Sequence, residues 1–110
     1  VYSISEEDRR PLAATPPGSR ALLVGAGRRT IVPAVGGVIG RSRQCDIMLA
    51  DSNVSRRHAE LRPAADGWEI SDLGSTNGVR VNGRKISSSH PLSSGDMIEL
   101  GSSELRFELE

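Results

Sequence analysis

The sequence has 110 residues, of which 36% are hydrophobic and 25% are charged, and its formal net charge is zero at pH 7. This length and composition predict one globular domain with a single core. No apolar run approaches the roughly 18–20 residues that a membrane-spanning helix requires, so we expect no membrane insertion. The zero net charge removes the simplest argument for nucleic-acid binding. The single cysteine, Cys45, excludes an internal disulfide and fits a reducing compartment, so we expect a cytoplasmic protein.

The N-terminal segment differs in composition from the rest of the chain. Residues 1–18 are rich in Ser, Glu, Asp, Pro and Ala, and they end in Pro16-Pro17-Gly18. A segment without a sustained apolar period predicts a flexible tail or linker, and residues 19–110 are then expected to form the domain. Thr15 lies in this tail, and the sequence leaves open whether it is phosphorylated and bound in cis or in trans.

From residue 21 onward, short apolar runs are separated by turn-forming residues. In the last run, residues 105–109, leucine and phenylalanine alternate with charged residues, which is the period of a strand with one buried face. Pairs such as Asn77-Gly78 and Asn82-Gly83 mark the turns between runs. No segment carries the apolar stripe of a secure helix. The pattern predicts an all-β sandwich or barrel with strands over residues 21–24, 30–32, 38–39, 47–49, 58–61, 68–70, 79–81, 97–100 and 105–109.

Three polar clusters fall between the expected strands, where a sandwich would display them on loops. The planar N–H donors of an arginine guanidinium match the spacing of phosphate oxygens, and serine and threonine hydroxyls can donate to the remaining oxygens. Residues 40–58 also hold four arginines against two aspartates, which gives a local charge of +2. This inventory predicts a site for a phosphate dianion, formed by Gly40-Arg41-Ser42, Ser55-Arg56-Arg57-His58 and Gly74-Ser75-Thr76-Asn77-Gly78.

The order and spacing of these clusters resemble the forkhead-associated (FHA) family over about residues 20–110. The family fold is a β-sandwich of about eleven short, mostly antiparallel strands with ligand-binding loops at one end. The resemblance therefore implies this fold and a phosphothreonine-dependent peptide-binding module in Ser/Thr-kinase signalling. It rests on Val38-Ile39-Gly40-Arg41, Asp46-Ile47, the run from Asp51 to Ala59, the run from Asp72 to Val79, Val81-Asn82-Gly83, Leu92, Gly95-Asp96, Ile98 and Leu100-Gly101.

The same resemblance implies how a phosphopeptide would be held. Arg41 and Ser55 would bind the phosphate, and Thr76 would assist them. Asn77 would bond the peptide backbone, and Arg56 would make a polar contact to the peptide. The expected partner is thus a phosphothreonine-containing protein or peptide, such as a Ser/Thr kinase or its substrate.

Other motif positions have supporting roles in the family. The loop that contains Asn53 would help to select the residue three positions after the phosphothreonine, and Arg57 is either at the pocket rim or ordinary surface. Gly40 would let the chain turn so that Arg41 points into the pocket. His58 would brace the loops, and Asn82-Gly83 would form a tight turn. The expected structural motif therefore comprises Gly40, His58, Gly74, Gly78, Asn82 and Gly83.

Three alternative functions have weaker support in the sequence. We expect no enzyme, because Ser55 and His58 lack a third triad member and the glycine-rich runs depart from nucleotide-binding loops. We expect no metal or other cofactor, because no His or Cys pair has ligand spacing. Nucleic-acid binding would need stacking aromatics, and both Trp68 and Phe107 fall in expected strands. Phosphate-independent binding of a partner on a lateral face stays open beside the phosphopeptide function.

Overall fold

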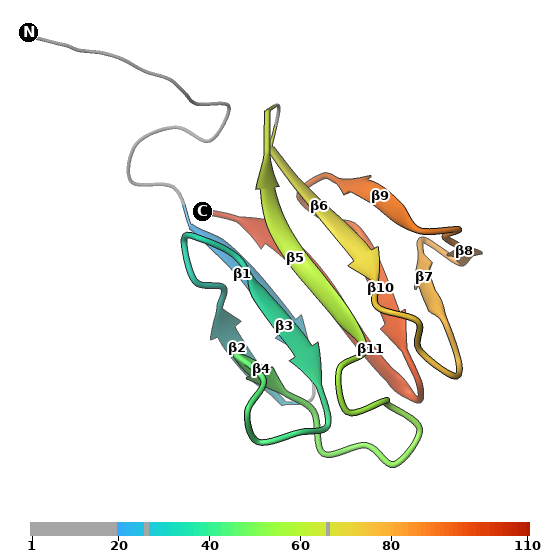
Figure 1. Cartoon of the computed structure of the whole chain (residues 1–110). Coiled ribbons are helices and arrows are strands. Elements are labelled where there is room, and N and C mark those ends of the chain that lie inside the picture. Colours follow the sequence, from blue (N-terminus) through green and yellow to red (C-terminus); the bar gives the residue numbers. More distant parts are fainter. Residues whose placement is uncertain (1–19, 26, 66) are drawn as a thin grey trace, which may run out of the picture.

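The computed structural model describes residues 20–25, 27–65 and 67–110. Within these residues the chain forms eleven strands and contains no helix that could cross a membrane. The expected N-terminal tail, including Thr15, lies outside the described residues. Figure 1 shows the strands arranged as two packed layers.

Two sheets make up these layers, and the predicted β-sandwich is confirmed. Every strand pair is antiparallel except β3 with β4, which run parallel. In spatial order the first sheet consists of β2 (Arg28–Ile31), β1 (Ala21–Gly25), β11 (Ser103–Leu109), β10 (Met97–Leu100), β7 (Val79–Val81) and β8 (Arg84–Lys85). The second consists of β4 (Ile47–Met48), β3 (Gly37–Gly40), β5 (Ala59–Ala64), β6 (Gly67–Asp72) and β9 (Ser89–Leu92).

The core lies between the two sheets and is built from the inward-facing residues of the alternating strands. Phe107 of β11 is fully buried, and Trp68 of β6 is 5% exposed. Their ring centroids lie 6.3 Å apart at an interplanar angle of 59°, so this aromatic pair joins the two layers. Because both rings belong to the core, neither offers a surface on which a nucleic-acid base could stack.

Two strands were missing from the sequence prediction. In β9, Ser89, His90 and Pro91 are exposed, so the strand has no alternating apolar pattern. It forms because β6 offers it a free edge, with Trp68 opposite Leu92, and proline is tolerated on an edge strand. The other missing strand, β8, has only two residues and exists because the preceding turn folds it back on β7.

The turn before β8 has the geometry expected for Asn-Gly. Asn82 and Gly83 have φ values of 53° and 84°, which are the left-handed conformations that a tight two-residue hairpin requires. The Asn82 side chain donates to Asp96 Oδ1 at 3.0 Å and accepts from the Met97 amide at 2.9 Å. This turn lies at the opposite end of β7 from Asn77, so it stabilises the fold away from the loops with the predicted ligand residues.

The loops with those predicted ligand residues lie together at the lower end of the sandwich in Figure 1. They follow β3, β4, β6 and β10, and they span residues 41–46, 49–58, 73–78 and 101–102. Each loop begins and ends at a strand that is hydrogen-bonded into one of the two sheets, which holds the ends of the loop in place. The fold therefore places the three polar clusters on one rigid edge.

Candidate functional site

Gly40 sets the distance between the β3–β4 loop and the β4–β5 loop. The amide of Arg41 donates to Ser55 O at 3.0 Å, and the amide of Ser42 donates to Arg56 O at 3.2 Å. A Cβ atom on Gly40 would overlap the Arg56 carbonyl, so only glycine permits these bonds. We expected Gly40 to allow a turn, but its φ is not positive. The glycine is required for close backbone approach instead.

Arg41 is anchored by one nitrogen of its guanidinium group. Its Nε atom donates to Val54 O at 3.0 Å, which fixes the direction of the exposed side chain. Within the described residues, the two terminal nitrogens have no hydrogen bond or ion pair. The anchored group can therefore present its outer donors to a ligand anion without first losing a protein partner.

Ser55 joins the three polar loops. Its carbonyl accepts from Arg41, its amide donates to His58 Nδ1 at 3.0 Å, and its Oγ accepts from the Thr76 amide at 3.1 Å. The hydroxyl hydrogen has no acceptor in the part of the chain that the structure describes. The serine oxygen is thus held in place while its proton remains available to a ligand oxygen.

His58 lies beneath the loops and is fully buried. Its Nδ1 accepts from the Ser55 amide, and its Nε2 lies 2.7 Å from Gly78 O. A neutral ring with its proton on Nε2 satisfies both contacts. The ring therefore links the β4–β5 loop to the β6–β7 loop and leaves no nitrogen for a ligand.

The β6–β7 loop displays Thr76 and Asn77 on a braced turn. The amide of Ser75 donates to Asp72 Oδ1 at 2.8 Å, and the amide of Gly78 donates to Ser75 Oγ at 2.9 Å. Two glycines on either side of this turn, Gly74 and Gly78, both have φ of 79°, which L side chains rarely adopt. Thr76 and Asn77 are exposed at the tip, where their side chains can reach a ligand.

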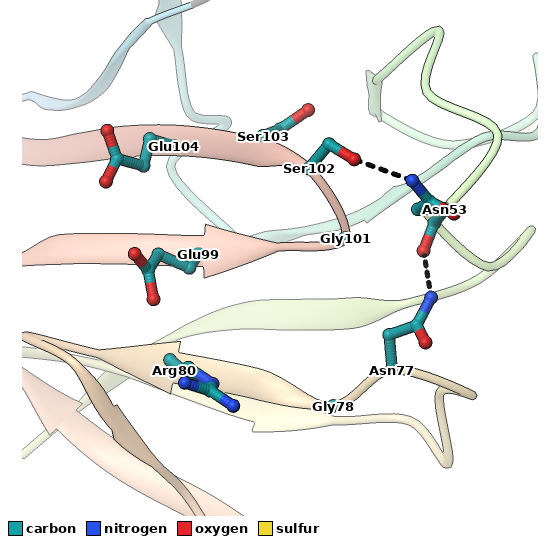
Figure 2. A pocket seen from close by; sticks show the side chains of 9 residues that line it. All are labelled: Asn53, Asn77, Gly78, Arg80, Glu99, Gly101, Ser102, Ser103 and Glu104. Atoms are coloured by element: carbon teal, nitrogen blue, oxygen red, sulfur yellow. Dashed lines mark hydrogen bonds between the residues drawn. The ribbon is translucent and has the colours of Figure 1, made fainter.

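The two asparagines of the site are connected to each other (Figure 2). Asn77 Nδ2 donates to Asn53 O at 2.7 Å, and Asn53 Nδ2 donates to Ser102 Oγ at 2.6 Å. Asn77 can therefore receive a peptide N–H on its side-chain oxygen while its amide nitrogen stays bonded to the protein. Asn53, which we expected at the rim or in a specificity role, is a bridge between the β6–β7 and β10–β11 loops.

Asp51 organises the β4–β5 loop, although the sequence indicated it only as part of the motif. Its carboxylate accepts from the Asn53 amide at 2.9 Å, the Ser102 amide at 2.9 Å and the Ser103 hydroxyl at 2.8 Å. The bond from Asn53, followed by that from Ser103, lowers the pKa of Asp51 below its ordinary value of 3.8. The sequence offered one signal for this role: Asp51 stands two residues before Asn53, and Asp side chains commonly accept a hydrogen bond from the backbone amide two positions later.

The outer side of the site is basic. Arg43, Arg56 and Arg57 are exposed, and none of them has an ion pair among the described residues. Cys45 is half-buried, with its Sγ 3.0 Å from Arg56 O, so it packs inside the loop. The site therefore combines an anchored arginine, a held hydroxyl and exposed positive charge.

Residues 37–101, which include these loops and the strands that hold them, match the family pattern described as FHA domain. The chain belongs to the FHA domain family. The match begins at β3 and ends in the β10–β11 turn. The hydrogen bonds described above bring Arg41, Ser55, Thr76 and Asn77 of this FHA domain to one end of the fold, whereas Asn82 and Gly83 lie at the other end.

Similar proteins include an enzyme inhibitor and two proteins of solved structure. The oxoglutarate dehydrogenase inhibitor of Corynebacterium jeikeium is 40% identical, over 97% of this chain and 78% of the relative. Mycobacterium tuberculosis EmbR, solved in complex with a low-affinity phosphopeptide, is 34% identical with a TM-score of 0.79, over 86% of this chain and 26% of EmbR. A structure from a study of phosphothreonine-dependent FHA domain interactions is 34% identical with a TM-score of 0.75, over 81% and 95% of the two chains.

Proposed function

We propose that the chain is a binding module for phosphothreonine-containing segments of proteins in Ser/Thr-kinase signalling. The observation that carries the proposal is the position of Arg41. Its guanidinium is anchored on the carbonyl of Val54, the residue before Ser55, and its terminal nitrogens have no partner among the described residues. Phosphothreonine carries about −1.5 to −2 charges at pH 7 and three strong acceptor oxygens, which matches these donors.

Each predicted contact has a distinct task in this proposal. Arg41 and Ser55 bind the phosphate oxygens, and Thr76 adds a hydroxyl from the neighbouring loop. Asn77 accepts a peptide N–H on its side-chain oxygen, and Arg56 contacts the peptide from the exposed side of the β4–β5 loop. Gly40, His58, Gly74 and Gly78 hold the loops in place, and we assign no ligand contact to Asn82-Gly83.

The proposed mode of action is binding without catalysis. The relative from Corynebacterium jeikeium is named for inhibition of another enzyme, which fits a regulatory role exerted through binding. In this site His58 is buried with both ring nitrogens engaged, so it cannot serve as a base for Ser55. We place this activity in the cytoplasm, where Ser/Thr kinases would phosphorylate the partner. Incubation with a phosphothreonine peptide should release no free phosphate.

Fluorescence anisotropy tests the binding proposal. The chain is titrated with three peptide libraries that differ only in phosphothreonine, phosphoserine or unmodified threonine at one fixed position. We expect binding to the phosphothreonine library and its loss in Arg41→Ala. The matched control is Arg84→Ala, which removes an exposed arginine from β8. Equal binding to phosphothreonine and threonine would refute the proposal and favour a phosphate-independent face.

A further inference from the structure

An apolar groove lies at the end of the sandwich opposite the proposed phosphopeptide site. Its volume is about 430 Å³. It is formed where β1 and β6 begin and where β2 and β5 end, away from the polar loops in Figure 1. Ile31, Pro33, Ala34, Pro63 and Trp68 give it apolar walls, and Ile31 is 57% exposed. The groove is therefore an open apolar surface that shares no residue with the phosphopeptide site.

A turn between β2 and β3 projects an apolar side chain beside this groove. The Gly36 amide donates to Pro33 O at 2.8 Å and closes the turn, and Val35 at its tip is 87% exposed. Turn tips usually carry Gly, Asn, Asp or Ser, which suit the turn backbone and can bond to it. Val35 buries almost none of its surface, so the fold does not explain an apolar side chain at this position.

The backbone around Val35 holds it in one position. Gly36 has a φ of 93°, and a Cβ atom there would overlap the Leu61 carbonyl, so the turn packs closely against β5. The ring of Pro33 fixes the backbone φ at the start of the turn. A side chain that is held before a partner arrives loses little conformational entropy on binding. Val35 is thus preorganised for contact with another surface.

The projecting side chain and the groove lie side by side, which makes this surface self-complementary. A two-fold axis between two copies brings Val35 of each copy to the groove of the other and closes the assembly as a dimer. The margin carries both signs of charge, because Arg20 lines the groove and its Nε lies 3.9 Å from Glu110 Oε1. An apolar centre with a polar margin is the usual anatomy of a protein interface.

We propose that this end of the sandwich binds a second copy of the chain, with Val35 of each copy seated in the groove of the other. The surface has fewer residues than the roughly 20–30 on each side of a standard interface, so we expect a weak dimer with a dissociation constant on the order of 0.1–1 mM. The two sets of polar loops then lie at the far ends of the dimer. Such a dimer can hold two phosphothreonines of one partner at once, a consequence that alone rests on the proposed function.

Sedimentation velocity of the full chain over about 0.01–1 mM tests the dimer, since this range reaches the expected dissociation constant. Val35→Asp places a charge in the groove of the other copy, and aspartate suits a turn. The matched control is Met48→Asp, which changes an apolar residue of β4 that is 37% exposed. We expect dimer to form with rising concentration in wild type and Met48→Asp, and association to weaken at least about tenfold in Val35→Asp.

A mixing experiment tests the two-fold geometry. Ile31→Arg adds a positive charge to the groove, and alone it should weaken the dimer as Val35→Asp does. An equimolar mixture of the two variants should form more dimer than either variant alone. In the mixed dimer, one contact pairs opposite charges and the other keeps both original residues.

The indole N–H of Trp68 reports on the groove, because Trp68 is the only tryptophan of the chain and gives one indole NMR signal. This signal should move with concentration in wild type and stay fixed in Val35→Asp. A dimer that persists in Val35→Asp, or a mixture no more dimeric than its components, would overturn the proposal.

Wild type that stays monomeric at about 1 mM would also overturn the proposal, because that concentration reaches the upper end of the expected range. If deletion of residues 1–18 then moved the Trp68 signal, the groove would belong to the N-terminal segment instead. None of these measurements uses a phosphopeptide, so failure of the dimer leaves the proposed function standing.

Discussion

At the scale of single residues, the site depends on side chains that are held by the protein on one side and exposed on the other. Arg41 Nε donates to Val54 O, Ser55 Oγ accepts from the Thr76 amide, and Asn77 Nδ2 donates to Asn53 O. Within the described residues, the remaining donor or acceptor of each side chain has no hydrogen-bond partner. Holding these groups before the ligand arrives reduces the conformational entropy lost on binding.

Ser55→Ala tests this arrangement directly. The change removes the proposed donor to the ligand and the acceptor of the Thr76 amide, so the two loops lose one of the hydrogen bonds that connect them. We expect phosphothreonine-peptide affinity to fall by about 1–3 kcal/mol, the range for loss of one partner of a polar contact. The control Ser87→Ala replaces an exposed serine between β8 and β9. Calorimetric titration that gives wild-type affinity for Ser55→Ala would remove this serine from the site.

Asp51 is expected to make the free energy of unfolding change with pH in the acid range. Its pKa is lowered in the folded protein by the Asn53 amide and the Ser103 hydroxyl, relative to the ordinary value of 3.8. The stabilisation is therefore fully present above pH 3.8 and is lost as pH falls through the lower folded pKa. In Asp51→Asn we expect lower stability at neutral pH and a smaller difference from wild type in acid. Urea unfolding at several pH values measures this, and a constant difference would contradict it.

At the scale of elements, the site depends on how closely β3 and the β4–β5 loop approach each other. Gly40→Ala would push a Cβ atom into the Arg56 carbonyl and separate the two segments. We expect a loss of more than about 2 kcal/mol in unfolding free energy, because backbone cannot yield as a flexible side chain can. Gly27→Ala is the comparison, since Gly27 has a φ of 77° and open space around it.

For Gly27→Ala only the left-handed backbone is strained, so a loss of about 1 kcal/mol is expected. Urea denaturation of the two variants separates close approach from backbone strain. Equal losses would contradict the role that we give to Gly40.

The sequence predicts most elements, because their burial follows local alternation. The runs at 79–81 and 97–100 coincide with β7 and β10. The prediction over 30–32 is displaced, because pairing with β1 extends β2 through Arg28 while Val32 is buried after the strand ends. The strand β9 could not be predicted, since only its partner β6 makes it a strand.

The site shows the same division between local and distant signals. The residue types of the site could be predicted, because the family motif consists of short stretches of sequence that are recognised locally. The network from Asp51 to Ser103 joins residues 52 positions apart, and the bond from Asn53 to Ser102 joins residues 49 positions apart. No local pattern encodes such contacts, so the bridging role of Asn53 appears only once β10 and β11 bring their turn beside the β4–β5 loop.

At the scale of the whole molecule, the sandwich separates binding from stability. The core packs between the two sheets and the Asn82-Gly83 turn lies away from the loops, while the proposed ligand residues lie on loops at one end. We propose that residues 19–110 form the binding domain and that residues 1–18, a tail or linker outside it, are not needed for its fold. Deletion of residues 1–18 should leave the midpoint of thermal unfolding and the phosphothreonine-peptide affinity unchanged. A large fall in the midpoint would show that the domain begins earlier.

The most direct test of the central claim is an NMR titration of the isotopically labelled chain with a phosphothreonine peptide. We predict that the amide signals of Arg41, Ser55, Thr76 and Asn77 shift, while those of the β8–β9 segment stay fixed. The unphosphorylated peptide should shift none of them. Shifts that spread over a lateral face of the sandwich, or that appear equally with the unphosphorylated peptide, would contradict phosphothreonine recognition by these loops.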